Sequence, residues 1–276
     1  MVYILVDSSS DIDIRTKENY KFVPITVCFG DKSYQDGVDL NKDTFYKLLT
    51  ENDDFPKTAH PSPETNLSIF EKVKAQQAEI VCLLLSSGLS GNYQSALIAK
   101  QMVDYDKIHI VDTRSLTYGI VLLSHYADKL RAQGKSGKEI ADACDILKEK
   151  IRLVAGLDTL EYLQKGGRIS RASAAVGTMA NIKPVLTITP EGTVQIIAKS
   201  MGRVRAMQAI LKFISENPID PEHNSYSVYT LGEENAAEME RKFDSCGITN
   251  YQRGQVGSTI GAHAGPGVYG LIYIAK

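Results

Sequence analysis

The feature that most constrains the fold is the segment Ile80–Ser86, in which nearly every side chain is apolar. A continuous run of this length predicts a strand that is buried on both faces of a sheet. The run leads through a glycine-containing turn into a helical pattern, Tyr93–Val103, and then into a second strand, Ile108–Thr113. Another helical pattern, Tyr118–Gln133, follows. This alternation of strands and helices is typical of a parallel βαβ arrangement.

Each strand of this pattern ends in a polar turn. A further apolar run, Val2–Val6, stops at Asp7 and three serines, and it predicts another buried strand. Polar turns also follow the other two strands, at Ser86–Asn92 and at Asp112–Ser115. Ligands of open parallel sheets bind at the carboxyl ends of the strands, so these three turns mark the expected binding edge.

Three other segments of the amino-terminal half carry local predictions. Phe22–Gly30 predicts one further strand, and residues 31–37 predict a polar turn after it. Residues 41–52 have the pattern of a short amphipathic helix, with Asn41 or Asp43 available as its N-cap. Lys57–Glu64 is predicted to be a loop that two prolines stiffen.

The pattern changes after Ser136, and we expect a second unit to begin near residue 151. Its strands alternate polar and apolar residues more than the earlier ones, and residues 189–193, TPEGT, are a hairpin signal. The predicted fold class is therefore α/β. An α/β/α unit with a parallel sheet is expected over residues 1–150, and an α/β unit with a mixed sheet over residues 151–276.

Composition and charge exclude several classes of protein. Of the 276 residues 43% are hydrophobic, which predicts a sizeable core rather than disorder. The formal net charge of -2 gives no reason to expect nucleic acid or an anionic membrane as the main partner. The four cysteines are far apart, with neither metal-ligand spacing nor a disulfide framework. No apolar run approaches the roughly 18 residues of a transmembrane helix. We expect a cytoplasmic protein with no metal and no cofactor.

The turn SSGLSGN, residues 86–92, is the most informative local motif. It connects a buried strand to a helix, whose amino terminus offers free backbone N–H groups to a carboxylate or phosphate. Ser90 adds a hydroxyl donor, and Asn92 is a further candidate contact. The motif is equally consistent with ordinary turn chemistry. A serine hydrolase relay of Ser90, Asp112 and His263 is also conceivable, although the spacing of the glycines around Ser90 does not match G-x-S-x-G.

Two further loops carry candidate ligand contacts. KTAHPSPE offers the hydroxyls of Thr58 and Ser62, which suit a small polar head group, although this stretch alone favours a surface loop. Near the carboxyl terminus, Ile260–Gly270 surrounds His263 with glycines, which permit close approach of the backbone to a ligand or simply a sharp turn before the last strand.

A basic stretch lies between these motifs. Arg168 follows two glycines and has the chemistry to bind a carboxylate, although a solvated arginine is the alternative. The small-residue run of residues 172–181 predicts a tightly packed helix. Lys199, Arg203 and Arg205 are usually a solvated face, and they also suit an acidic docking partner.

Taken together and in order, these motifs resemble the DegV family, essentially from Val6 to Tyr273. They are DSSSDI, KTAHPSPE, SSGLSGNYQSA, VDTRSLTYGI, LEYLQKGGRIS and GAHAGPGVYGLIY. The resemblance implies a two-domain fold shared with a dihydroxyacetone kinase subunit. It also implies that a long-chain fatty acid binds between the domains. In bacteria such a protein presents the acid to a separate ATP-dependent fatty acid kinase, which makes an acyl-phosphate for phospholipid synthesis.

The same resemblance assigns roles to particular residues. Thr58, Ser90 and His263 would bind the fatty acid carboxylate, Arg168 would contact ligand or partner, and the protein itself would not be catalytic. Two motifs depart from the family pattern: Ala59 and His60 stand where T-S-Q-P-S has serine and glutamine, and Ala264 replaces the threonine of H-T-G-P-G. Three alternatives stay open: a serine hydrolase, a dihydroxyacetone-type kinase acting through His263, and a regulatory binding module without lipid. Against the kinase, no nucleotide-binding motif is visible.

Overall fold

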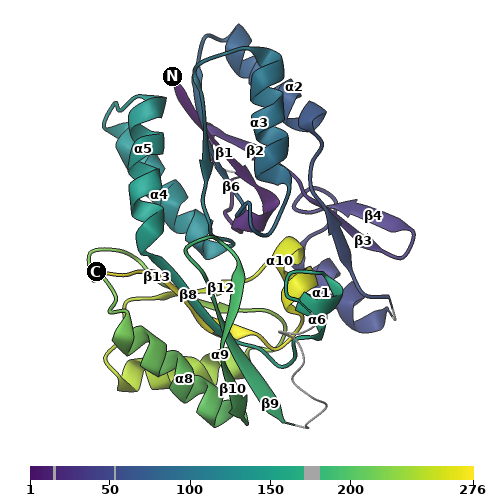
Figure 1. Cartoon of the computed structure of the whole chain (residues 1–276), viewed down its shortest axis with the longest axis vertical. Helices are drawn as coiled ribbons and strands as arrows, with labels where there is room; N and C mark the ends of the chain where they lie inside the picture. Colours follow the sequence, from purple (N-terminus) through teal and green to yellow (C-terminus); the bar gives the residue numbers. More distant parts are fainter. Residues whose placement is uncertain (15–16, 53, 171–180) are drawn as a thin grey trace.

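The computed structural model describes residues 1–14, 17–52, 54–170 and 181–276 (Figure 1). Its first sheet has four parallel strands in the order β2-β1-β6-β7. They are β1 (Val2–Asp7), β2 (Tyr20–Val23), β6 (Glu79–Leu84) and β7 (Ile108–Asp112). The predicted parallel βαβ arrangement is confirmed, and the three polar turns lie at one edge of this sheet because β1, β6 and β7 point the same way.

Helices cover both faces of the parallel sheet. Consecutive residues of β6 divide between two core clusters: Cys82 packs with Phe70 on one face, and Leu83 packs with Ile120 on the other. This division follows from the alternation of side chains along a strand. The helices are α2 (Pro63–Ala75) and α3 (Asn92–Val103) on the first face, and α4 (Tyr118–Ala132) and α5 (Gly137–Leu147) on the second.

The second sheet is mixed and has six strands in the order β10-β9-β8-β13-β11-β12. Only β11 and β12 pair in parallel; the other neighbours are antiparallel, and TPEGT forms the predicted hairpin between β9 and β10. The strands are β8 (Ile151–Gly156), β9 (Ile182–Ile188), β10 (Val194–Met201), β11 (Tyr226–Tyr229), β12 (Gln252–Gln255) and β13 (Tyr269–Ile274). The predicted mixed sheet is confirmed.

The two faces of the mixed sheet have different neighbours. One face packs on α8 (Arg203–Glu216) and α9 (Glu234–Ser245), in a core that includes Met207 and Phe243. The opposite face, with Leu153 and Leu186, joins the same core cluster as α4 and the parallel sheet. The two sheets therefore share one continuous apolar core, and α4 lies between them (Figure 1).

A small third sheet lies beside this junction. It has the order β4-β3-β5, with β3 (Thr26–Phe29), β4 (Lys32–Gln35) and β5 (Lys57–Ala59), all antiparallel. Val27 of this sheet packs in one core cluster with Phe45 of α1 (Lys42–Glu51) and Ala262 of α10 (Ser258–Ala264). A short helix, α6 (Glu161–Lys165), contacts α10 from the other side.

Three local predictions for the amino-terminal half were wrong. The predicted strand Phe22–Gly30 is two strands in different sheets, because Pro24 has no N–H for the ladder and the N–H of Ile25 is donated to Ser8 Oγ instead. The predicted polar turn of residues 31–37 contains β4, and the predicted loop Lys57–Glu64 contains β5 and the start of α2. The predicted cap Asn41 does accept a hydrogen bond from the N–H of Thr44. Most of the predicted helix over residues 172–181 lies outside the described residues.

The carboxyl end of β1 is held by a buried carboxylate. Asp7 is fully buried and accepts hydrogen bonds from the N–H of Leu85 at 2.9 Å, from Asn92 Nδ2 at 2.8 Å, and from both the N–H and the hydroxyl of Ser9. Burial raises the pKa of Asp7, and these four donors oppose that rise. This carboxylate joins the turns that follow β1 and β6.

We expect Asp7→Ala to lower the free energy of unfolding by roughly 3 kcal/mol or more, because the substitution leaves several buried donors without an acceptor. Urea denaturation measures the change. Asp112→Ala is the control, because Asp112 accepts from Ser87 and from the N–H of Arg114 at the same sheet edge but is only partly buried. Equal losses in the two variants would contradict the assigned role of Asp7.

Candidate functional site

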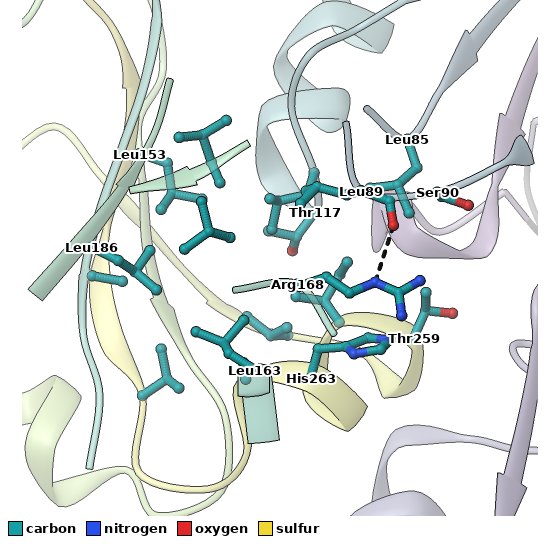
Figure 2. A pocket seen from close by; sticks show the side chains of 18 of the residues that line it. Leu85, Leu89, Ser90, Thr117, Leu153, Leu163, Arg168, Leu186, Thr259 and His263 are labelled. Atoms are coloured by element: carbon teal, nitrogen blue, oxygen red, sulfur yellow. Dashed lines mark hydrogen bonds between the residues drawn. The ribbon is translucent and has the colours of Figure 1, made fainter. Parts of the chain in front are cut away.

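A deep pocket lies where the two sheets and α10 meet. The space between its walls and in its open mouth together amounts to about 970 Å³. Most of the side chains that line it are aliphatic. Figure 2 shows that Leu153 and Leu186 lie at one end, whereas Ser90, Arg168 and His263 lie at the other. The pocket thus has an apolar end against the mixed sheet and a polar end beside α10.

The polar end is centred on His263. Thr58 on β5 and His263 on α10 are brought together, with 2.8 Å between Thr58 Oγ1 and His263 Nε2. The other ring nitrogen, Nδ1, is buried and has no hydrogen-bond partner within the described part of the chain. Burial, and then the positive charge of Arg168, lower the pKa of His263 to about 4. The imidazole is therefore neutral at neutral pH.

The glycine pair before Arg168 has two separate roles. A Cβ on Gly166 would lie 2.1 Å from His263 Nδ1, so only glycine leaves room for the imidazole. Gly167 has φ +72°, a left-handed conformation that ends α6. The N–H groups of Gly167 and Arg168 donate to the carbonyls of Gln164 and Leu163, which is a Schellman motif. This local geometry turns the chain so that Arg168 reaches the pocket.

Arg168 is a half-buried cation at the polar end. Its Nε donates to the carbonyl of Leu89 at 3.1 Å (Figure 2). Its Nη1 donates to the carbonyl of Gly166. Burial lowers the pKa of this guanidinium, although far too little to discharge it at neutral pH. No carboxylate among the described residues forms an ion pair with Arg168. A half-buried charge without a counter-ion favours an anionic ligand at this end of the pocket.

The other candidate contacts divide between the pocket and the rest of the molecule. Ser90 lines the polar end from the turn before α3, and its Oγ accepts from the N–H of Asn92 at 3.3 Å. Asn92 itself is fully buried and faces Asp7 rather than the pocket. Ser62 is exposed just before α2 and does not line the pocket. His60, by contrast, lies among the lining residues.

The basic residues beyond Arg168 lie on another part of the surface. Lys199 is exposed on β10, an edge strand of the mixed sheet. Arg203 begins α8 and is partly buried, and its Nε has no partner among the described residues. Arg205 is exposed on the same helix. None of the three lines the pocket.

The groups of the conceivable hydrolase relay are not assembled. Such a relay needs a hydrogen bond from Ser90 to His263 and another from His263 to Asp112. The Asp112 carboxylate instead accepts from Ser87 and from the N–H of Arg114, and His263 Nε2 faces Thr58. The described residues thus contain no activated nucleophile at Ser90.

Sequence reasoning missed three threonines of the pocket and its whole apolar lining. Besides Thr230, these threonines are Thr117, which has φ +44°, and Thr259. Thr259 lies on α10, where its Oγ1 donates to Asp36 at 2.6 Å. The glycines around His263 had suggested a turn, but the turn Gly265–Gly267 follows the helix instead of replacing it. The aliphatic lining has no sequence signal, because its side chains do not differ from those of the core.

We also searched the described residues for metal-binding groups, membrane-spanning helices and paired cysteines. Over the described residues, no group of three or more His, Cys, Asp and Glu side chains is arranged to hold a metal ion. None of the described helices combines the length and the apolar character needed to cross a membrane. The cysteines are unpaired, and Cys246 is exposed rather than buried.

Comparison with known proteins gives consistent matches over the whole chain. A model of the DegV family, described as uncharacterised protein of that family, matches residues 1–276. A DegV domain-containing protein of Caldanaerobacter subterraneus subsp. tengcongensis is 36% identical over 279 residues, which covers 100% of this chain and 99% of that protein.

Two solved structures have the same fold. A DegV family protein from Thermus thermophilus, described by its fatty acid binding, has a TM-score of 0.87 and 27% identity over 100% of this chain and 99% of its own. A stearic acid-binding protein from Eubacterium ventriosum has a TM-score of 0.87 and 26% identity over the same shares. The family match from the first residue to the last, with a relative at 36% identity, establishes that this chain belongs to the DegV family.

Proposed function

We propose that this protein binds one long-chain fatty acid, with its carboxylate at Thr58, Ser90 and His263 and its chain along the apolar end of the pocket. The observation that carries the proposal is the half-buried guanidinium of Arg168, which has no carboxylate partner among the described residues and lies at the polar end of a mostly aliphatic pocket. The fatty acid binding of the Thermus thermophilus relative and the stearic acid binding of the Eubacterium ventriosum relative support it. In this proposal the acid lies between two domains that meet near residue 150.

The two ends of the pocket suit the two parts of a fatty acid. Each methylene that leaves water contributes about 0.8 kcal/mol, so the chain supplies most of the affinity. The carboxylate must then be paired, because a buried charge without partners is costly. The Arg168 guanidinium, the two hydroxyls and the neutral imidazole offer hydrogen bonds and one positive charge to that carboxylate.

We further propose that the protein is not the catalyst but presents the carboxylate to a separate, ATP-dependent fatty acid kinase in the cytoplasm. Ser90 has no adjacent general base in its present contacts, which favours binding over covalent chemistry. Phosphorylation then requires the kinase to reach the carboxylate oxygen from the polar end, where the lining residue His60 is exposed. Lys199 and Arg203 are the proposed docking residues for an acidic surface of that kinase.

We expect Thr58→Val to weaken fatty acid binding by roughly 10-fold to 100-fold, because it removes a hydrogen bond to a charged group while keeping the shape of the side chain. Isothermal titration of the delipidated protein with oleate measures Kd. Ser62→Ala removes a hydroxyl from the same stretch outside the pocket, and its Kd should stay within about twofold. Similar losses in both variants would count against a carboxylate at Thr58.

The proposal also predicts a change in the pKa of His263. A carboxylate beside the imidazole favours its protonated form, so the pKa of about 4 should rise when an acid binds. An NMR pH titration of the imidazole resonances should give a pKa about one pH unit or more higher with a fatty acid than with the alcohol of equal length. The alcohol controls for burial by the chain. The same pKa in both complexes would exclude a carboxylate next to His263.

For the docking proposal, Lys199→Glu should lower kcat/KM of acyl-phosphate formation by the fatty acid kinase roughly tenfold, and more at low salt, because charge complementarity governs encounter. The acid-loaded protein is the substrate in this assay, and Kd for the acid should not change. Lys138→Glu makes the same charge change on α5, where the side chain is 72% exposed. If Lys138→Glu had an equal effect, net charge rather than a docking surface would explain the result.

A further inference from the structure

A second cavity adjoins the apolar end of the fatty acid pocket. Including its mouth it encloses about 870 Å³, and its lining differs in kind from that of the first pocket. Charged and amide side chains are prominent in it, among them Arg114, Arg152 and Gln195. Among the described lining residues, Leu153 and Ile188 line both cavities. These two residues therefore lie between the two cavities.

The fold holds these two side chains next to each other. The antiparallel ladder between β8 and β9 pairs Ala155 with Leu186 and Val154 with Thr187, and the next residues outward are Leu153 and Ile188. Residues directly opposite each other in such a ladder share a face of the sheet. Thr187 fixes this end, because its Oγ1 donates to the carbonyl of Leu153 at 2.7 Å.

We infer that Leu153 and Ile188 form an end wall that limits the length of acyl chain the pocket accepts. The inference rests on the proposed function and adds a specificity-determining position to it. Leu153 lies opposite the polar end, where a carboxylate at His263 would direct the chain (Figure 2). A chain that fills the apolar pocket meets this wall, and longer chains have to displace it or fold back. Beyond the wall a methylene would face Arg152 and Gln195 rather than aliphatic carbon.

The neighbouring Leu186 provides a matched control. Leu153 and Leu186 are 6% and 7% exposed, belong to the same core cluster, and lie together at the apolar end (Figure 2). Leu186 lines only the first pocket. Either leucine-to-alanine substitution frees the volume of about three carbon atoms, but only Leu153→Ala also opens the way to the second cavity.

The test is a Kd series for saturated fatty acids from 14 to about 24 carbons on the delipidated full-length protein. For the wild type we expect Kd to tighten by roughly fourfold per methylene up to one chain length and to weaken beyond it. In Leu153→Ala the longest acids should bind within about threefold of the best one. In Leu186→Ala the weakening should persist, displaced by at most about three carbons.

The outcomes separate this inference from the proposed function. Equal tolerance of the longest acids in the two alanine variants, or an unchanged cut-off in Leu153→Ala, would overturn the end wall alone. A wild type that binds no acid of any length would overturn the proposed function and the end wall together. If Leu153→Ala fails to fold, Ile188→Ala replaces it in the test, because Ile188 is the other wall residue and is less buried. The same tolerance of the longest acids is expected for it.

Discussion

The imidazole of His263 contacts parts of the chain that are far apart in sequence, and the polar end of the pocket depends on these contacts. Its Nε2 lies against Thr58 of the small third sheet, and its Nδ1 lies so close to Gly166 that no side chain fits there. The turn that follows Gly166 delivers Arg168, whose charge helps to keep the imidazole neutral. A histidine with a normal pKa would be partly protonated and would add a second positive charge to this end.

The sequence predicted this site unevenly, and the reasons are physical. Short continuous apolar runs such as Ile80–Ser86, bounded by turn signals, favour buried strands, so the parallel sheet and the edge at which its strands end were predictable. Ser90 was found because its turn chemistry is local. His263 was singled out from the sequence, but its helix was missed because a seven-residue helix that contains Gly261 is too short to give a periodic signal. The split of Phe22–Gly30 between two sheets depends on Ser8, which no local pattern contains.

The apolar half of the site could not be predicted at all. Leu153 and Leu186 belong to the core cluster that joins the two sheets, and they differ from their neighbours only in facing unfilled space. Whether a buried leucine lines a cavity depends on how well the opposing elements pack, and that is a property of the assembled sheets rather than of a sequence window. The cavity lies where the two sheets meet beside α10, whose residues Ile260 and His263 line it.

The position of the pocket between the two sheets also suits the proposed function, in which this protein binds the acid and a separate enzyme phosphorylates it. A pocket formed between the two sheets holds a long chain well, but it surrounds the carboxylate with groups that stabilise its present charge. Arg168 and the hydroxyls favour the anion, and the neutral His263 has no carboxylate partner to make it a stronger base. Transfer of a phosphoryl group needs instead a bound nucleotide and in-line geometry. In the proposed function, these contacts orient a carboxylate oxygen for attack, and the phosphoryl transfer is left to the proposed kinase that brings the nucleotide.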